Sequence, residues 1–214
     1  MMPTILLVRH GITEMNDSEN ERIRGYCDVP ISEEGKRVVK QTAKFLRPFP
    51  IRHILTSPLQ RAIMTAEIIA EETSATVRPD PGLLPWNLGD YMEQPVKKVA
   101  PKMDKLQELV DVRAPHGESY REFYERWEAG LTRLMVYAEK HLDEYPLGVV
   151  HSRNLLALPS VLGEEEIGDV PVKGGPGPES VVCVYKDGDT WKWEVISSTA
   201  GLLPRPHLLL YPKR

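Results

Sequence analysis

The sequence predicts an α/β fold, a three-layer sandwich in which helices flank a mostly parallel central sheet. Short apolar strand patterns alternate along the chain with longer segments that have the spacing of amphipathic helices. Two of the strand patterns are apolar without interruption, which is typical of strands buried on both faces. The 214 residues show no internal repeat and no long linker, so we expect a single domain spanning residues 1–214.

The first half of the chain predicts two strand–helix units. Residues 4–8 form the first apolar strand pattern, and Ser32 with the two acidic residues behind it predicts the start of a helix. Residues 51–56 form the second strand pattern. Ser57 predicts the N-cap of the next helix and Pro58 its first residue, where the missing N–H of proline costs nothing.

The middle of the chain is less regular. Residues 76–78 predict a short strand, and the Pro- and Lys-rich segment 79–116 predicts loops with one helix near Met103–Val110. Ser119 and Glu122 match a capping box at the start of a long amphipathic helix.

The last third predicts strands again. The apolar run 147–150 ends on His151, and residues 180–198 predict a hairpin that turns at Asp187–Gly188. Because functional loops gather at the carboxyl ends of parallel strands, we expect the residues that follow the strand patterns to meet.

Composition excludes some classes of function. The net charge of −4 and the pI of about 5.9 disfavour a nucleic-acid-binding protein. The two cysteines, Cys27 and Cys183, belong to no metal or redox motif, which favours a reduced, cytoplasmic protein. No signal-peptide pattern is evident, and no apolar run reaches the roughly 18 residues that would indicate a membrane span.

Basic residues stand where three of the predicted strands end. Arg9 and His10 follow the first strand, Arg61 lies in the first turn after the second, and His151 follows a later one. Such a cluster predicts a local binding site for an anion. Positive charge from Arg9 and Arg61 would keep the imidazole of His10 neutral, and their guanidinium groups suit phosphoryl oxygens.

Four blocks of residues occur in order before His151. They are RHGxTxxN at Arg9–Asn16, G-x-x-D-x-P-I-S-x-x-G at Gly25–Gly35, S-P-L-x-R-A-x-x-T-A at Ser57–Ala66, and GES at Gly117–Ser119. This order resembles the histidine phosphatase superfamily, also called the phosphoglycerate mutase-like family. The resemblance implies a phosphatase that hydrolyses a phosphomonoester, or a more activated phosphoryl compound, on a small phosphorylated substrate.

The resemblance also implies roles for single residues. His10 would become the phosphohistidine, and Arg9, Arg61 and His151 would form the phosphate pocket, with the amide of Asn16 as a further contact. We expect no cofactor and no metal, because the arginines would repel a cation.

The proton donor is the point where the sequence departs from the family. Pro85 occupies the place of the usual glutamate, and Ser152 follows the second histidine, where other members carry glycine or aspartate. Asp90 and Glu93 are nearby candidates, and Glu93 is the better one. A missing acid matters most for an alkyl alcohol leaving group, because general acid catalysis contributes about a hundred- to ten-thousand-fold.

Two alternatives remain open at this level. One is phosphoryl transfer of the cofactor-dependent phosphoglycerate mutase type, although segment 79–116 contains no counterpart of the extra substrate-binding segments of the mutases. The other is a catalytically weakened member that binds phosphorylated ligands, which the loss of the acid at Pro85 favours and the intact basic cluster disfavours. No feature of the sequence specifies an oligomeric state.

Overall fold

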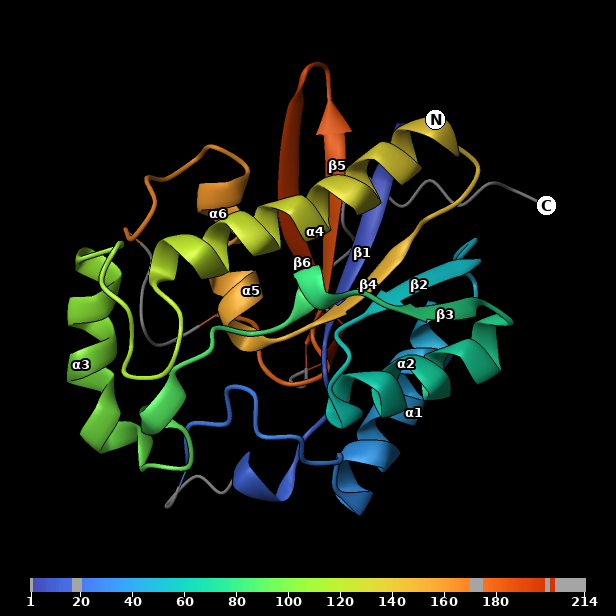
Figure 1. Ribbon diagram of the computed structural model, residues 1–214. Coiled ribbons are helices and arrows are strands. Elements are labelled where there is room, and N and C mark those ends of the chain that lie inside the picture. The colour runs from blue at the N-terminus through green and yellow to red at the C-terminus, as the bar shows by residue number, and fades with distance from the viewer. Residues whose placement is uncertain (1, 17–20, 170–174, 199–200, 203–214) are drawn as a thin grey trace.

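The computed structural model describes residues 2–16, 21–169, 175–198 and 201–202 and shows three layers around a central sheet (Figure 1). In these residues the sheet has seven strands in the order β3-β2-β4-β1-β5-β6-β7. The strands are β1 (Thr4–Arg9), β2 (His53–Thr56), β3 (Thr76–Pro79), β4 (Leu147–Val150), β5 (Val181–Asp187), β6 (Thr190–Ser198) and β7 (Gly201–Leu202). The predicted α/β sandwich is therefore confirmed.

Helices cover both faces of the sheet. The helices are α1 (Glu33–Leu46), α2 (Gln60–Thr73), α3 (Val96–Glu108), α4 (Tyr120–Lys140), α5 (Ser152–Leu156) and α6 (Leu158–Val161), and the short 3-10 turns are η1 (Glu14–Asn16), η2 (Pro81–Leu83) and η3 (Gly89–Tyr91). Helices α1 and α2 pack on one face, and α3 to α6 pack on the other. Successive residues of β1 face alternate cores, with Ile5 and Leu7 in one and Leu6 and Val8 in the other.

The sheet is mixed rather than purely parallel. Strands β3, β2, β4 and β1 pair in parallel, whereas β1–β5, β5–β6 and β6–β7 pair antiparallel. The hairpin at Asp187–Gly188 makes β6 antiparallel to β5, because it returns the chain beside β5 without a crossover helix. All the parallel strands lie together, so their carboxyl ends share one edge of the sheet.

Helix α2 begins two residues later than Pro58. Leu59 is its extended N-cap, and the N–H of Gln60 donates to the side chain of Asp28 at 2.6 Å. Ser57 instead extends the pairing of β2 with β4, because its backbone N–H donates a hydrogen bond to the carbonyl of Val149. The cap that we predicted at Ser57 therefore comes from a distant loop.

Helix α3 is longer than the predicted helix at Met103–Val110. It starts at Val96 and passes through Pro101. The predicted capping box is confirmed, since the hydroxyl of Ser119 accepts from the N–H of Glu122 and the carboxylate of Glu122 accepts from the N–H of Ser119.

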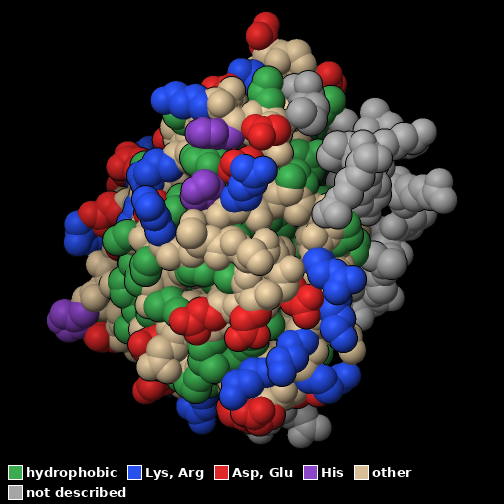
Figure 2. Space-filling model, turned by 90° about the vertical axis from the view of Figure 1, so that its right-hand side faces the viewer, with side chains coloured by type: hydrophobic (Ala, Val, Ile, Leu, Met, Phe, Trp, Pro, Cys, Tyr) green, Lys and Arg blue, Asp and Glu red, His purple; other side chains and the backbone are tan. Residues whose placement is uncertain are grey.

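The surface carries both signs of charge. On the face drawn in Figure 2, basic and acidic side chains are intermingled and do not gather into one extended basic patch. None of the described helices combines the length and the apolar character that crossing a bilayer requires.

Candidate active site

Two parallel strands bring two histidines together. His10 follows β1 and His151 follows β4, its neighbour in the sheet, and the N–H of His10 donates to the carbonyl of Val150. The two imidazole rings lie 4.9 Å apart between centroids and are tilted by 59°. The shared strand edge thus turns two distant residues into one site, as the sequence predicted.

The imidazole of His10 is held in one tautomer. Its Nδ1 lies 2.8 Å from the carbonyl oxygen of Gly11, an acceptor, so Nδ1 carries the proton and Nε2 keeps a free lone pair. Burial, and then the charges of Arg61, Arg24 and Arg9, hold the pKa of His10 well below its usual range. The ring is therefore uncharged at neutral pH, and the lone pair of Nε2 takes no proton there.

The backbone next to His10 is fixed by close packing. A side chain at Gly11 would meet the Cγ2 atom of Val39 at 2.7 Å, so only glycine fits there. The N–H of Gly11 donates to the hydroxyl of Thr65, which in turn donates to the carbonyl of Arg61. Thr65 thereby joins the turn after β1 to helix α2.

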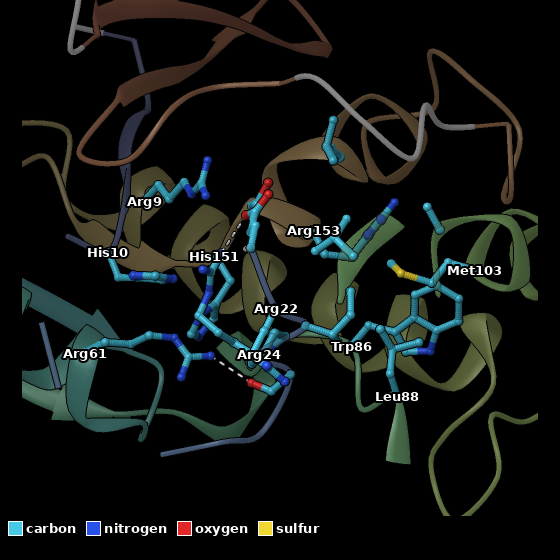
Figure 3. Close-up of a pocket in the computed structure, with 18 residues that line it drawn as sticks. Arg9, His10, Arg22, Arg24, Arg61, Trp86, Leu88, Met103, His151 and Arg153 are labelled. Carbon is cyan, nitrogen blue, oxygen red and sulfur yellow. Dashed lines mark hydrogen bonds and ion pairs between the residues drawn. The ribbon is translucent and has the colours of Figure 1, made fainter. Parts of the chain in front are cut away.

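Arg61 is buried and anchored by two carbonyl groups. Its terminal nitrogens donate to the carbonyls of Gly25 and Cys27, each at 2.7 Å. Gly25 has a φ of +45°, a conformation that favours glycine. Desolvation lowers the pKa of Arg61 to about 10, so the guanidinium stays charged. Figure 3 shows this group pointing towards the histidines.

Two further arginines complete the cationic cluster. Arg9 donates to the carbonyl of Pro176 at 2.9 Å, and burial lowers its pKa to about 10. Arg24 donates to the carbonyl of Met15 and lies 3.5 Å from the carboxylate of Glu21. Arg24 was not among the predicted site residues, although it directly precedes the glycine of the second motif block.

His151 offers both ring nitrogens to the cavity. It is buried, and neither nitrogen has a hydrogen-bond partner among the described residues. Burial, and then Arg61 and His10, hold the pKa of His151 well below its usual range. Ser152, which stands where relatives carry glycine, is the first residue of α5, and its backbone does not adopt a positive φ. Serine is therefore accommodated without strain.

Glu179 supports the cluster from outside the cavity wall, and no sequence signal singled it out. One carboxylate oxygen accepts the N–H of Ile12 at 2.7 Å, and the Glu179 N–H donates to the carbonyl of Arg9. Burial raises the pKa of Glu179 to about 7. Glu179 therefore connects Arg9 and Ile12, which lie on either side of His10 in the sequence, to the loop before β5.

Two of the predicted site residues lie away from the cavity wall. The side-chain oxygen of Asn16 accepts from the N–H and the hydroxyl of Thr13 and so closes the turn at η1. Glu93 is exposed with a φ of +63°, and its carbonyl accepts from Arg22. Asp90 pairs with His116 at 2.9 Å.

A cavity of about 410 Å³ opens beside the histidines and has two unlike halves (Figure 3). We call the part around Arg9, His10, Arg61 and His151 the cationic half, and the part around Trp86, Leu88 and Met103 the apolar half. Arg24 lines the cavity as well. A volume of this size is in the range of small-molecule sites.

The proton donor's usual place is part of the cavity wall. Pro85 lines the cavity there, and it has no proton to give. Among the described residues that line the cavity, Glu21 is the single carboxylate, and it is paired with Arg24. Across the described residues no group of three or more His, Cys, Asp or Glu side chains is arranged to hold a metal ion.

Comparison with known proteins places this geometry in a family. The profile of the histidine phosphatase superfamily (branch 1) matches residues 5–197. The chain belongs to this superfamily. A curated relative from Yersinia enterocolitica, named "Probable phosphoglycerate mutase GpmB", is 33% identical over 166 residues, which cover 75% of each chain.

Solved structures share the fold. A mycobacterial glucosyl-3-phosphoglycerate phosphatase in complex with VO3 matches with a TM-score of 0.76 and 27% identity over 90% of this chain and 98% of that one. YhfR from Bacillus stearothermophilus matches with a TM-score of 0.75 and 25% identity over 90% of this chain and 95% of that one.

Proposed function

We propose that this member of the superfamily is a metal-independent phosphatase in which His10 becomes phosphorylated and water then releases phosphate. The observation that carries the proposal is the tautomer of His10. Its Nδ1–H is engaged by the carbonyl of Gly11, so the free Nε2 lies within a cluster of three arginines. A neutral nucleophile among fixed cations suits attack on a dianionic phosphoryl group.

The cationic half supplies what phosphoryl transfer needs. The guanidinium groups of Arg9 and Arg61 would bind and polarise the phosphoryl oxygens, and the uncharged ring of His151 would donate or accept a hydrogen bond on the opposite side. Because Arg61 is held by two backbone carbonyls, little side-chain freedom would be lost when the substrate binds.

Covalent labelling tests this proposal. The protein is incubated with radiolabelled para-nitrophenyl phosphate, quenched, and examined for a label that is stable to base and labile to acid. We expect labelling in the wild type and in His116→Ala, a matched variant of an exposed histidine, and none in His10→Ala. Equal labelling of His10→Ala would contradict the proposal. Turnover unchanged after chelation of metals would support metal independence, and loss of turnover would contradict it.

A mutase is the second candidate, favoured by the 33% identity to the Yersinia relative named as a probable phosphoglycerate mutase. A mutase must hold a hydroxylated intermediate and return the phosphoryl group to it, and the apolar half offers few partners for hydroxyl groups. Isomerisation of phosphoglycerate faster than phosphate release would favour the mutase. Binding of phosphorylated compounds without turnover of any of them would favour the weakened, ligand-binding member.

We propose that the protein binds a small phosphorylated compound, and neither nucleic acid nor a membrane. The intermingled surface charges of Figure 2 and the net charge of −4 support this.

A further inference from the structure

The cavity is larger than a phosphoryl group requires. Its volume of about 410 Å³ continues from the histidines past Arg22 and Arg24 to Trp86 (Figure 3). The leaving group of the substrate must therefore occupy the apolar half. Since the proposed function fixes only the phosphoryl end, the walls of this second half determine which compounds fit.

The apolar half is lined mainly by side chains from two segments. Trp86 and Leu88 belong to the segment between η2 and η3, while Val96, Ala100 and Met103 form one stripe of α3. These α3 residues are spaced by four and three positions, so they share one face of the helix. The surface they form with Trp86 is apolar and suits a flat hydrocarbon body.

Trp86 is a rigid part of this wall. Its ring packs edge-on against Tyr120 at 5.1 Å and stacks with Phe123 at 6.4 Å, and its indole N–H donates to the carbonyl of Glu118. The guanidinium of Arg153 lies 5.9 Å from the ring centroid. A preformed aromatic wall of this kind binds another ring at low entropic cost.

Polar leaving groups fit this half poorly. A glycerol or sugar leaving group would place hydroxyls against Leu88 and Met103, and each buried hydroxyl without a partner costs about 1–3 kcal/mol. Arg153 also lines the cavity, but its guanidinium already donates to the side-chain oxygen of Gln107 at 3.0 Å. An aromatic ring would bury apolar area against the same side chains and gain about 25 cal/mol per Å².

The wall also determines how the leaving oxygen can depart. Pro85 stands where a carboxylic acid would deliver a proton, and Glu21 is paired with Arg24. In Figure 3, Arg24 lies between the histidines and Trp86. A fixed cation there would stabilise negative charge that develops on the oxygen, a role that does not require a proton.

From these observations we infer that the site takes aromatic phosphoryl compounds, aryl phosphates or aromatic acyl phosphates, whose leaving oxygen departs as an anion beside Arg24. This inference rests on the proposed function. Nε2 of His10 attacks phosphorus, the bond between phosphorus and the leaving oxygen breaks, and its electron pair remains on that oxygen. Water then attacks the phosphohistidine, the P–N bond breaks, and both protons of the water leave with the inorganic phosphate.

A series of leaving groups tests the inference. The substrates are para-nitrophenyl, phenyl, phenethyl and glycerol phosphates, with benzoyl phosphate as the acyl arm. Phenethyl phosphate is the central control, because it is apolar and aromatic but releases an alkoxide. We expect its kcat/KM to lie at least about a hundredfold below that of para-nitrophenyl phosphate, the factor that a missing general acid explains. The relative kcat/KM of benzoyl and phenyl phosphates identifies the acyl or the aryl class as the preferred one.

Restoring the acid sharpens the test. Pro85→Glu should raise kcat/KM for phenethyl and glycerol phosphates at least about tenfold and change that for para-nitrophenyl phosphate little, whereas Pro85→Gln should raise neither. Arg24→Gln should make the dependence on the leaving group steeper than in the wild type. If circular dichroism shows that Pro85→Glu does not fold, the leaving-group dependence of Arg24→Gln tests the inference instead.

Two outcomes would overturn the inference. One is wild-type turnover of phenethyl phosphate as fast as that of para-nitrophenyl phosphate, and the other is an unchanged leaving-group dependence in Arg24→Gln. Either result leaves phosphatase activity in place. Absence of both turnover and a phosphohistidine with all five substrates would instead overturn the proposed function itself.

Discussion

The two halves of the cavity are built in different ways. The cationic half consists of residues at the ends of parallel strands and in the first turn of α2, and the side chains of Arg9, His10 and Arg61 are held by hydrogen bonds to backbone carbonyls. The apolar half consists of an irregular segment around Trp86 and one stripe of α3, held by side-chain packing. The groups that we propose to react are thus positioned by the sheet, whereas the leaving-group preference that we infer depends on the segment around Trp86 and on α3.

The largest effect is expected from the cationic half. His10→Ala removes the nucleophile, so turnover of every phosphorylated substrate should fall at least about a thousandfold. Steady-state phosphate release measures this, and the melting temperature should change little. A loss of turnover confined to aromatic substrates would contradict the proposal that the cationic half acts on every substrate and the apolar half only on the leaving group.

Arg61→Lys keeps the charge of the cationic half but not its geometry. A lysine cannot donate to the carbonyls of Gly25 and Cys27 and to a phosphoryl group at once, so kcat should fall about a hundredfold for all substrates alike. The measurement is kcat for para-nitrophenyl and glycerol phosphates. Arg37→Lys, an exposed arginine of α1, is the matched control and should leave kcat unchanged.

Trp86→Ala tests the apolar half alone. It removes the aromatic wall, so kcat/KM for phenyl phosphate should fall about tenfold, whereas that for glycerol phosphate should change less than about threefold. Competition between the two substrates reports the ratio directly. Equal losses for both would mean that Trp86 acts through the fold rather than through the leaving group.

The smallest effect concerns stability and Glu179. Burial raises its pKa from 4.5 to about 7, so the folded protein keeps a proton that the unfolded chain has released across this interval. Stability should therefore fall as the pH rises from about 4.5 to 7 and stay low above it. The shift sets a ceiling of about 3 kcal/mol, which solvent screening lowers to about 1–2 kcal/mol.

Glu179→Gln checks this expectation. Glutamine can still accept the N–H of Ile12 but does not ionise, so the variant should be more stable than the wild type at about pH 8 and close to it at about pH 4. Denaturant unfolding at the two pH values measures the difference. Glu179→Ala lacks the hydrogen bond and should be less stable than Glu179→Gln at both, and an identical pH dependence in wild type and Glu179→Gln would contradict the assigned pKa.

The sequence predicted those features that depend on the spacing of nearby residues, namely the strands, the helices and the residues at the strand ends. Arg9, His10 and His151 could be placed together because apolar strands and their ends are visible in the sequence, and parallel strands share an edge. The hairpin of β5 and β6 was visible from its turn at Asp187–Gly188, but its antiparallel pairing with β1 was not, because no local pattern determines which strand β5 lies beside.

Contacts between residues that are far apart in the sequence were missed, because no local pattern indicates them. Asp28 caps α2 and Glu179 holds the N–H of Ile12, yet neither lies near its partner in sequence. Pro101 masked the start of α3, and with it the stripe that lines the apolar half. Arg24 lies in a polar stretch where only tertiary packing shows that it reaches the cavity. The contacts predicted for Asn16 and Glu93 stay predictions.

The anchoring of the turn after β1 has a consequence for synthesis on the ribosome. Arg9 and Ile12 each bind a partner 167 residues further along, Pro176 and Glu179. His10, the proposed nucleophile, therefore leaves the exit tunnel long before the groups that fix the backbone on either side of it. A nascent chain that ends before β5 can assemble the parallel strands while Arg9 and Ile12 still lack these anchors. Phosphohistidine formation on stalled chains of increasing length should then begin only after Glu179 has emerged, which makes catalysis a late marker of completed folding.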